Sequence, residues 1–291
     1  MSDARAPFES NPPSPGCPLC RVAPVRVVQK AEPIALVECS GCGFLFSHPP
    51  PDPEANRAFH DEAYFRRYYG ESIEEFHRNR GPLWHRIAEF NRARLAILLR
   101  HWMSPGRLLD VGAGQGLFLE VARESGFQVA GCDVSTPTAR FHAGRGIEFR
   151  TGAVEEAFRE PRAFDIVTLW QTLEHTVDPV ATLRHVRTLL RAGGIVIVSV
   201  PNMGGLLSRI KLVVGKPFLS PASAERHYGH WRPATLAVHL AATGFRVLER
   251  TAEPSQERRA LLGAIERFGD AVFRTTGFEV QGSLTWVAAA E

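Results

Sequence analysis

The sequence predicts an α/β fold, in which a doubly wound and mostly parallel sheet follows a small cysteine-containing module and a helical connector. Three observations lead to this prediction. From residue 107 onward, short apolar strands alternate with helix-like segments, a pattern typical of right-handed crossovers between parallel strands. Four of the five cysteines lie within the first 42 residues. Between these two parts, residues 54–103 are charged and carry apolar side chains at helical spacing.

The composition is that of an ordinary globular protein of 291 residues, with 44% hydrophobic and 22% charged residues. A wholly disordered or collagen-like chain is therefore excluded. The most apolar strand, Ile195–Val200, is far shorter than the ~20 residues of a membrane helix. With 34 basic and 31 acidic residues, the net charge of +3 is too small to indicate a nucleic-acid or membrane surface. The N-terminal segment lacks the apolar core of a signal peptide, so we expect a cytoplasmic location.

Prolines and glycines divide the chain. The run Pro49-Pro50-Pro51-Asp52-Pro53 is a stiff linker, and Ser104-Pro105-Gly106 ends the connector. We expect four parts in chain order: a loose tail (1–16), the cysteine-containing module (17–53), a helical connector (54–104) and the main domain (105–291).

The four N-terminal cysteines have the spacing of a zinc site. Two residues separate Cys17 from Cys20, 18 residues follow, and two residues separate Cys39 from Cys42. Each pair can direct two thiolates at one ion, so the two pairs complete a tetrahedral sulfur shell. Two unrelated cysteine pairs are the alternative. Because a closed four-sulfur shell leaves no open position, we expect a structural zinc whose binding contributes to folding.

Strands and helices are expected throughout both parts of the chain. The module should contain strands at 25–29 and 35–38, and a charged helix-like piece at 256–268 should separate the last two strands of the main domain. In the main domain we expect helices near 117–125, 138–143, 179–190 and 233–243, and strands at 108–111, 128–132, 148–150, 164–170, 195–200, 246–250 and 284–288.

A glycine-rich loop follows the first strand of the main domain, in Leu108-Leu109-Asp110-Val111-Gly112-Ala113-Gly114-Gln115-Gly116. Its glycines permit a tight turn and the close approach of a ligand, which then faces the amides at the start of the next helix. Leu117 stands where a dinucleotide-binding loop has its third glycine, which weakens the interpretation as a dehydrogenase. Asp133 ends the next strand, where a carboxylate can accept both hydroxyls of a ribose. A turn without a ligand is the alternative.

From about residue 107 to 290, the sequence resembles the class I S-adenosylmethionine (SAM) methyltransferases. The resemblance rests on the glycine loop, Asp133 and the segments Phe164–His175 and Arg191–Asn202. It implies a Rossmann-like seven-stranded sheet whose last strand is antiparallel. The run Cys39-Ser40-Gly41-Cys42-Gly43-Phe44-Leu45-Phe46 is similar to the zinc ribbon that precedes this domain in bacterial enzymes of natural-product, sugar or polysaccharide pathways. The core is similar to ubiquinone-type O-methyltransferases.

The resemblance also implies which residues bind SAM. Asp133 would bind the ribose, and Gln171 would lie beside the cofactor at the end of the fourth strand. Many relatives have an acid near Ala153 that binds the adenine amino group, and here backbone groups or Glu155 would replace it. The implied residues are Asp110, Gly112, Ala113, Gly114 and Gly116 at the methionine end, and Val134, Ala153 and Val154 around the adenine.

Methyl transfer needs a nucleophile aligned with the methyl group, and a hydroxyl acceptor benefits from a base with a pKa near neutral, usually a histidine. Glu174 and His175 follow the strand that faces the cofactor. His227 and His230 lie in a segment that covers the acceptor pocket in related enzymes. We expect one of these histidines to be the base, with Glu174 orienting His175 or capping a helix. A structural role is the alternative for each, and O-methylation is favoured over C- or N-methylation.

Ubiquinone-type relatives can also carry a divalent-metal site with the pattern E-x-x-E-H and a later Asn. The matching residues are Gln171, Glu174, His175 and Asn202. Because a neutral amide replaces the first acid, and hard cations prefer carboxylate oxygens, we do not expect a catalytic magnesium.

Two segments are candidates for a cover over the pocket. Residues 204–225, which include Lys211 and Lys216, are expected to form a mobile loop over the acceptor. Aromatic residues of the connector either pack against the main domain or form a lid over SAM and a flat acceptor: Tyr64, Phe65, Tyr68, Tyr69, Phe76 and Trp84.

These observations predict a SAM-dependent methyltransferase that acts on a small molecule, such as a natural product, a sugar or a quinone-like compound. An RNA or protein methyltransferase that grips its substrate with the zinc ribbon is one alternative. Few aromatic residues in the ribbon and the absence of an N/D-P-P-Y/F motif after the fourth strand disfavour it. A non-catalytic scaffold is another alternative, although the intact Asp110, Gly112 and Asp133 indicate that SAM binding at least persists.

Overall fold

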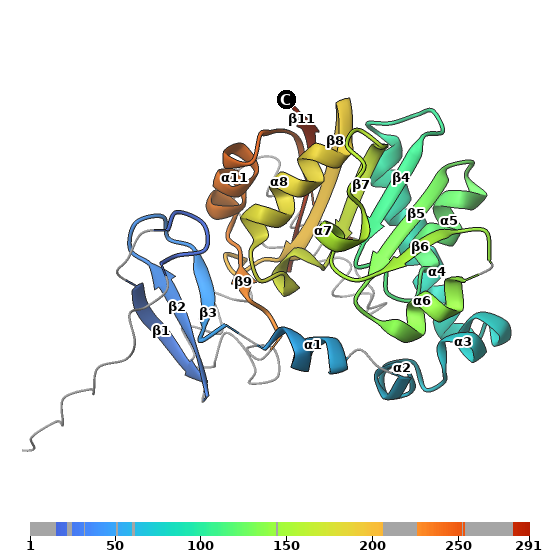
Figure 1. Cartoon of the computed structure of the whole chain (residues 1–291), viewed down its shortest axis with the longest axis horizontal. Helices are drawn as coiled ribbons and strands as arrows, with labels where there is room; N and C mark the ends of the chain where they lie inside the picture. The colour runs from blue at the N-terminus through green and yellow to red at the C-terminus, as the bar shows by residue number, and fades with distance from the viewer. Residues whose placement is uncertain are drawn as a thin grey trace, which may run out of the picture.

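Figure 1 shows the computed structural model, in which a larger α/β domain lies beside a small sheet from the N-terminal part of the chain. The structure describes residues 16–21, 25–31, 33–50, 52–59, 62–143, 145–205, 226–251, 253 and 282–291. Three predicted features lie outside these residues: the tail up to residue 15, the cover from residue 206 to 225 and the charged segment 256–268.

A seven-stranded sheet forms the centre of the larger domain, in the order β10-β11-β8-β7-β4-β5-β6 (Figure 1). Strands β4 to β8 pair in parallel, whereas β11 pairs antiparallel with both β8 and β10. The predicted fold class is therefore confirmed. The strands are β4 (Arg107–Val111), β5 (Gln128–Asp133), β6 (Glu148–Thr151), β7 (Phe164–Trp170), β8 (Leu190–Pro201), β10 (Phe245–Thr251) and β11 (Ser283–Ala290).

Helices cover both faces of this sheet. They are α4 (Pro82–Leu99), α5 (Leu117–Glu124), α6 (Thr136–His142), α7 (Val154–Ala157), α8 (Pro179–Leu189) and α11 (Pro233–Ala242), with a 3-10 turn η1 (Leu173–His175) after β7. Alternate residues of a strand point to opposite faces. Accordingly, Leu108 packs in a cluster with side chains of α4 and α5, and Leu109 packs in a second cluster with side chains of α8 and α11.

The connector consists of four helices, α1 (Pro53–Phe59), α2 (Glu62–Tyr69), α3 (Ile73–Asn79) and α4. A capping box starts α3, since the Ser72 hydroxyl accepts from the amide of Glu75 and the Glu75 carboxylate accepts from the amide of Ser72. Among the connector's apolar side chains at helical spacing, Leu98 is fully buried, but its neighbour Leu99 is 39% exposed at the end of α4. The connector consists of three short helices, of which α3 has a capping box, followed by the longer α4.

The small sheet has four strands in the order β1-β2-β3-β9, all antiparallel. β1 (Val25–Ala31) and β2 (Ile34–Cys39) were expected from the sequence, whereas β3 (Leu45–His48) and β9 (Gly229–His230) were not. β3 is buried along most of its length and so lacks the alternation that predicts a strand. β9 comes from the main domain, so the two parts of the chain share one sheet (Figure 1).

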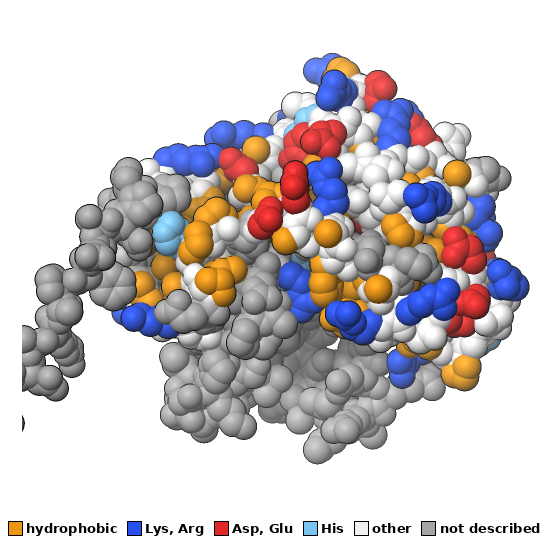
Figure 2. All heavy atoms as spheres, turned by 60° about the horizontal axis from the view of Figure 1, so that its bottom comes forward, with side chains coloured by type: hydrophobic (Ala, Val, Ile, Leu, Met, Phe, Trp, Pro, Cys, Tyr) orange, Lys and Arg blue, Asp and Glu red, His pale blue; other side chains and the backbone are white. Residues whose placement is uncertain are grey.

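Figure 2 shows basic, acidic and apolar side chains interspersed over the described part of one face, in agreement with the small net charge. None of the helices that the structure describes is long and apolar enough to cross a membrane.

Candidate active site

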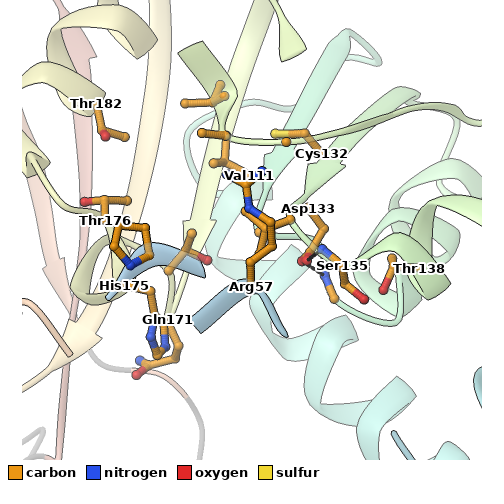
Figure 3. Close-up of a pocket in the computed structure, with 18 of the residues that line it drawn as sticks. Arg57, Val111, Cys132, Asp133, Ser135, Thr138, Gln171, His175, Thr176 and Thr182 are labelled. Carbon is orange, nitrogen blue, oxygen red and sulfur yellow. Dashed lines mark hydrogen bonds between the residues drawn. The ribbon is translucent and has the colours of Figure 1, made fainter. Parts of the chain in front are cut away.

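A cavity of about 490 Å³ lies at the carboxyl ends of β4, β5 and β7, a size ordinary for small-molecule sites. These strands flank the point where the strand order switches direction, which is where doubly wound sheets bind ligands. Figure 3 shows Arg57, Asp133, Gln171 and His175 among the side chains around it. The predicted site residues that line the cavity are Gly112, Gly114, Asp133, Val134, Ala153, Val154, Gln171 and His175.

The glycine loop turns from β4 into α5 at the floor of this cavity. Gly112, Gly114 and Gly116 all have positive φ values, of 70°, 53° and 74°. A Cβ atom on Gly112 would lie 2.5 Å from the Thr172 side chain, so both the conformation and the space require glycine there. The amide of Gly112 donates to the carbonyl of Cys132 at 2.8 Å, which ties the loop to β5.

Asp133 joins the glycine loop to the start of α6. One carboxylate oxygen accepts from the amide of Gly114 at 2.9 Å, and the other accepts from the amide of Ser135 at 2.8 Å. Because each carboxylate oxygen has two lone pairs, an oxygen bonded to one amide can accept a second donor such as a ribose hydroxyl. The arrangement suits the ribose role that the resemblance implies.

The residues expected around the adenine line the cavity beyond Asp133. Val134, Ala153 and Val154 form part of this wall. Glu155, named above as a replacement for the missing acid, also lines the cavity and accepts a hydrogen bond from the Thr182 hydroxyl at 2.7 Å. A carboxylate therefore lies where the adenine is expected, although the usual position holds Ala153.

Three predicted residues of the methionine end, Asp110, Ala113 and Gly116, do not line the cavity. Asp110 is buried behind the loop, where its carboxyl accepts from the Thr168 hydroxyl at 2.6 Å. Burial raises the pKa of Asp110 to about 7. The structure thus places Asp110 as a support of the loop, and contact with SAM stays a prediction for these three residues.

Gln171 lines the cavity in an unusual backbone conformation, with φ at 52°. Its side-chain amide donates to the Ser199 hydroxyl at 3.0 Å and to the Glu253 carboxylate at 2.7 Å. Arg94 pairs with Glu253 at 2.6 Å. Left-handed backbone at a non-glycine residue is costly and clusters at ligand sites, which agrees with the predicted place of Gln171 beside the cofactor.

Of the three candidate bases, the structure places His175 at the cavity. His227 and His230 do not line it. The ring centroid of His227 lies 4.8 Å from that of His175 and 6.0 Å from that of His230. The Nδ1 atom of His175 lies 3.1 Å from the carbonyl of Arg226. Because a carbonyl only accepts, Nδ1 carries the proton, and in the neutral ring Nε2 carries the lone pair.

Burial makes the other two histidines weak bases. It lowers the pKa of His227 to about 2, with the neighbouring His175 and His230 adding to the effect, and it lowers the pKa of His230 to about 3. A general base works best with a pKa near the operating pH. These two rings are therefore neutral and better suited to hydrogen bonding than to proton transfer.

Glu174 is 1% exposed, and one of its carboxyl oxygens has no hydrogen-bond partner among the described residues. Burial raises the pKa of Glu174 to about 8. Ligand atoms of Glu174, His175 and His227 lie within 4.8 Å of one another. Two imidazoles and one carboxyl group suit a transition-metal ion better than magnesium.

The other two residues of the predicted E-x-x-E-H-type pattern are engaged elsewhere. The Asn202 side chain accepts from the amide of Gly204 at 2.8 Å, and the Gln171 amide bonds to Ser199 and Glu253. The donors gathered around Glu174 are thus a different set from the one in the sequence pattern.

The four N-terminal cysteines come together as the sequence predicts. The sulfur atoms of Cys17 and Cys42 are 3.6 Å apart, those of Cys20 and Cys39 are 3.5 Å apart, and all four lie within 4.8 Å of one another. Four thiolates around zinc, each at about 2.3 Å, would be about 3.8 Å apart. The donor set and its spacing therefore fit a structural zinc ion.

Further parts of the cavity wall come from segments outside the strand ends: the connector supplies Arg57, Tyr64 and Tyr69, and the segment before β9 supplies Tyr228. Tyr69 lies beside the glycine loop, since its hydroxyl donates to the Gln115 side chain at 3.3 Å. The aromatic cluster of the connector is divided, since Tyr64 and Tyr69 line the cavity while Trp84 is buried in a packing cluster. No local pattern marks Arg57 or Tyr228, because only the fold brings them to the cavity.

Comparisons with known sequences identify a methyltransferase domain. Residues 83–250 match a family model described as a methyltransferase domain. The ubiquinone biosynthesis O-methyltransferase of Nitrosospira multiformis is 37% identical over 124 residues, which span 40% of this chain and 52% of that protein. The enzyme of the same name from Burkholderia thailandensis is 32% identical over 174 residues, 56% of this chain and 75% of that protein. The chain thus spans about half to three quarters of these relatives.

Solved structures share the fold at lower identity. The 1,6-didemethyltoxoflavin-N1-methyltransferase of Burkholderia thailandensis, solved with its substrate and S-adenosylhomocysteine (SAH), aligns with a TM-score of 0.54 and 19% identity over 92% of this chain and 99% of that one. The magnesium protoporphyrin IX methyltransferase of Synechocystis, solved with SAH, aligns with a TM-score of 0.56 and 15% identity. The alignment covers 82% of this chain and 100% of that one. The family match covers more than half of the sequence, and the chain therefore belongs to the methyltransferase-domain family, as a SAM-dependent methyltransferase that carries a four-cysteine zinc module.

Proposed function

We propose that this protein transfers the methyl group of SAM to a hydroxyl group of a small, flat acceptor, with His175 as the general base. The observation that carries the proposal is the position of His175. It lines the same cavity as the glycine loop and Asp133, and its ring is held with the proton on Nδ1 and the lone pair on Nε2. A base in that tautomer can take the proton of a hydroxyl as its oxygen attacks the methyl group.

The lining of the cavity supports the choice of a flat acceptor. The glycine loop, Asp133 and Ala153 lie on the side implied for SAM. The connector adds Tyr64, Phe65 and Tyr69 to the lining, and the Tyr69 hydroxyl donates to the Gln115 side chain of the glycine loop at 3.3 Å. Aromatic walls favour a flat molecule that can stack or pack edge-to-face against them.

The named relatives act on oxygen and nitrogen. Two of the matching enzymes are called ubiquinone biosynthesis O-methyltransferases, and one structural neighbour is an N1-methyltransferase. A protonated amine acceptor would also need a base, so the presence of His175 does not distinguish O-methylation from N-methylation. The chemical identity of the product distinguishes them. The O-methyl product is favoured because the sequence matches lie with the O-methyltransferases at 32–37% identity, whereas the N1-methyltransferase shares the fold at 19%.

The proposal is tested with purified full-length protein, SAM with a labelled methyl group and an extract of the source cells, separated by acceptor size. Label in the small-molecule fraction, with a methoxy group in the product by NMR, is the expected result. Label only in the RNA or protein fraction would overturn the proposal, and an N-methyl product would overturn its assignment to oxygen.

A further inference from the structure

The zinc module and the main domain share a sheet and a core. β9 pairs with β3 through Leu45 opposite His230 and Phe46 opposite Gly229. A Cβ atom on Gly229 would lie 3.0 Å from the ring of Phe44 in the zinc module, so glycine allows the close approach of the two parts. The apolar cluster that contains Cys17 also contains Trp231. The zinc module is therefore packed into the main domain rather than tethered to it.

Ion pairs support the same contact at its edges. Arg232, at the start of α11, pairs with Glu38 of β2 at 2.6 Å. Arg21 pairs with Asp178, the N-cap residue of α8, at 2.6 Å. Exposed ion pairs add little energy individually. These two join the module to the residues that begin α11 and α8.

Ser47 of β3 binds the segment that leads into β9. Its amide donates to the carbonyl of Tyr228 at 3.0 Å, and its hydroxyl donates to the carbonyl of His227 at 2.7 Å. The same hydroxyl lies 3.2 Å from Nε2 of His230, and because its one proton is used, it accepts from that nitrogen. On the other side, the amide of Tyr228 donates to the carbonyl of Glu174 at 2.7 Å. The backbone of Tyr228 is thus held between the zinc module and η1.

The phenol of Tyr228 has no hydrogen-bond partner among the described residues. The residue lines the cavity and is 5% exposed, and its hydroxyl oxygen is buried with no hydrogen-bond partner in the part of the chain that the structure describes. Burial, with the negative charge of Asp52, raises the pKa of Tyr228 to about 12, so the phenol is a neutral donor. A buried hydroxyl without a partner is costly, and at the wall of a ligand cavity it indicates that the ligand supplies the partner.

We propose that the zinc module is a structural part of the acceptor site: strand β3 holds Tyr228 at the cavity, and the phenol of Tyr228 donates a hydrogen bond to an oxygen atom of the acceptor. In this proposal Tyr228 is a substrate-binding residue and Ser47 is its positioning residue. The inference rests on the proposed function, since it assigns the acceptor side of the same cavity. It also gives the zinc module a role within the site in place of a grip on a macromolecule.

The first test measures binding of catechol, which has two adjacent oxygen atoms, to the SAH-loaded protein by calorimetry. Tyr228→Phe keeps the ring and removes only the hydroxyl, and we expect catechol to bind about 3- to 10-fold more weakly with SAH affinity unchanged. Tyr68→Phe is the matched control, because Tyr68 is 51% exposed and does not line the cavity. In Tyr68→Phe, the affinities for catechol and for SAH should both be unchanged.

The outcomes separate this inference from the proposed function. Wild-type catechol affinity in Tyr228→Phe would overturn the role of the phenol while leaving the proposed function intact. Failure of the wild-type protein to bind catechol would overturn the acceptor half of the inference together with the proposed small oxygen-bearing acceptor.

The second test needs no acceptor. Zinc is removed from the full-length protein with a chelator, and hydrogen exchange of residues 226–231 is followed by mass spectrometry. We expect about tenfold faster exchange there, with β4 and β5 still protected and SAH affinity unchanged. Unchanged exchange in the zinc-free protein would overturn the link between the module and Tyr228.

Ser47 variants keep the link testable if the zinc-free protein unfolds. Ser47→Ala leaves the four cysteines intact and removes the hydroxyl from the carbonyl of His227, so exchange of 226–231 should rise and catechol affinity should fall about 2- to 5-fold. Ser47→Thr retains the hydroxyl and should restore both values. Wild-type exchange and catechol affinity in Ser47→Ala would overturn the positioning role.

Discussion

Asp133→Asn is the most informative single change at the cofactor site. The carboxylate accepts amides of Gly114 and Ser135 at 2.9 and 2.8 Å, and the proposed ribose hydroxyls would be further donors to it. Asparagine has the same shape but only one accepting oxygen, so it cannot accept from both amides and from the ribose. Hydrogen bonds to a charged group contribute about 1.5–3 kcal/mol. At about 1.4 kcal/mol per tenfold change, SAH should bind about 10- to 150-fold more weakly.

The assay is calorimetric titration of SAH into the variant, with denaturant unfolding measured in parallel. Asp165→Asn is the matched control, because the Asp165 carboxylate also accepts a backbone amide, that of Arg107 at 2.6 Å, but at the amino end of β7. Both variants should lose some stability, and only Asp133→Asn should lose affinity for SAH. Wild-type SAH affinity in Asp133→Asn would refute the ribose assignment.

Four further predictions follow from the site. His175→Ala should lower kcat by about 100-fold with SAM affinity within about twofold, and equal losses in both would contradict a role as base. Gly116→Ala should abolish SAH binding or lower the melting temperature, because its Cβ would collide with the His142 ring at a positive φ; a variant as stable and as tightly binding as the wild type would show that the loop adapts. The raised pKa of Asp110, about 7 against an ordinary 3.8, means that the folded state holds a proton which the unfolded state releases. The free energy of unfolding should therefore fall between about pH 4 and pH 7, and Asp110→Asn should flatten this slope in denaturant titrations. Metal analysis should find one zinc per chain, lost in Cys17→Ser together with stability, and a stable metal-free wild type would exclude the zinc site.

The sequence predicts the main sheet well because its signals are local. The strand at 164–170 is a continuous apolar run, and the structure has β7 at the same residues. Gly112 and Asp133 mark the ends of strands whose positions follow from the same pattern. The cysteine spacing likewise limits the metal site to four residues, because two residues between ligands suit one tight turn.

The sequence predicts less of the acceptor side because its residues meet only in the folded chain. β9 has two residues, too few for any periodic signal, and it pairs with a strand about 180 residues earlier. Three histidines near the expected pocket could not be ranked from their positions in the sequence. The cavity wall and the hydrogen bond from Nδ1 to Arg226 distinguish His175, and both depend on tertiary packing.

The sequence by itself determined the α/β class, the glycine loop with its acid, and the four-sulfur metal site, since each is written in residues close together along the chain. The tertiary structure decided which histidine lines the cavity and which residues of the connector and of the segment before β9 join its wall. It also decided that the zinc module belongs to that wall, through Ser47 and Tyr228. The physical reason is that burial and hydrogen-bond partners, which set pKa values and side-chain positions, arise only when segments distant in sequence pack together.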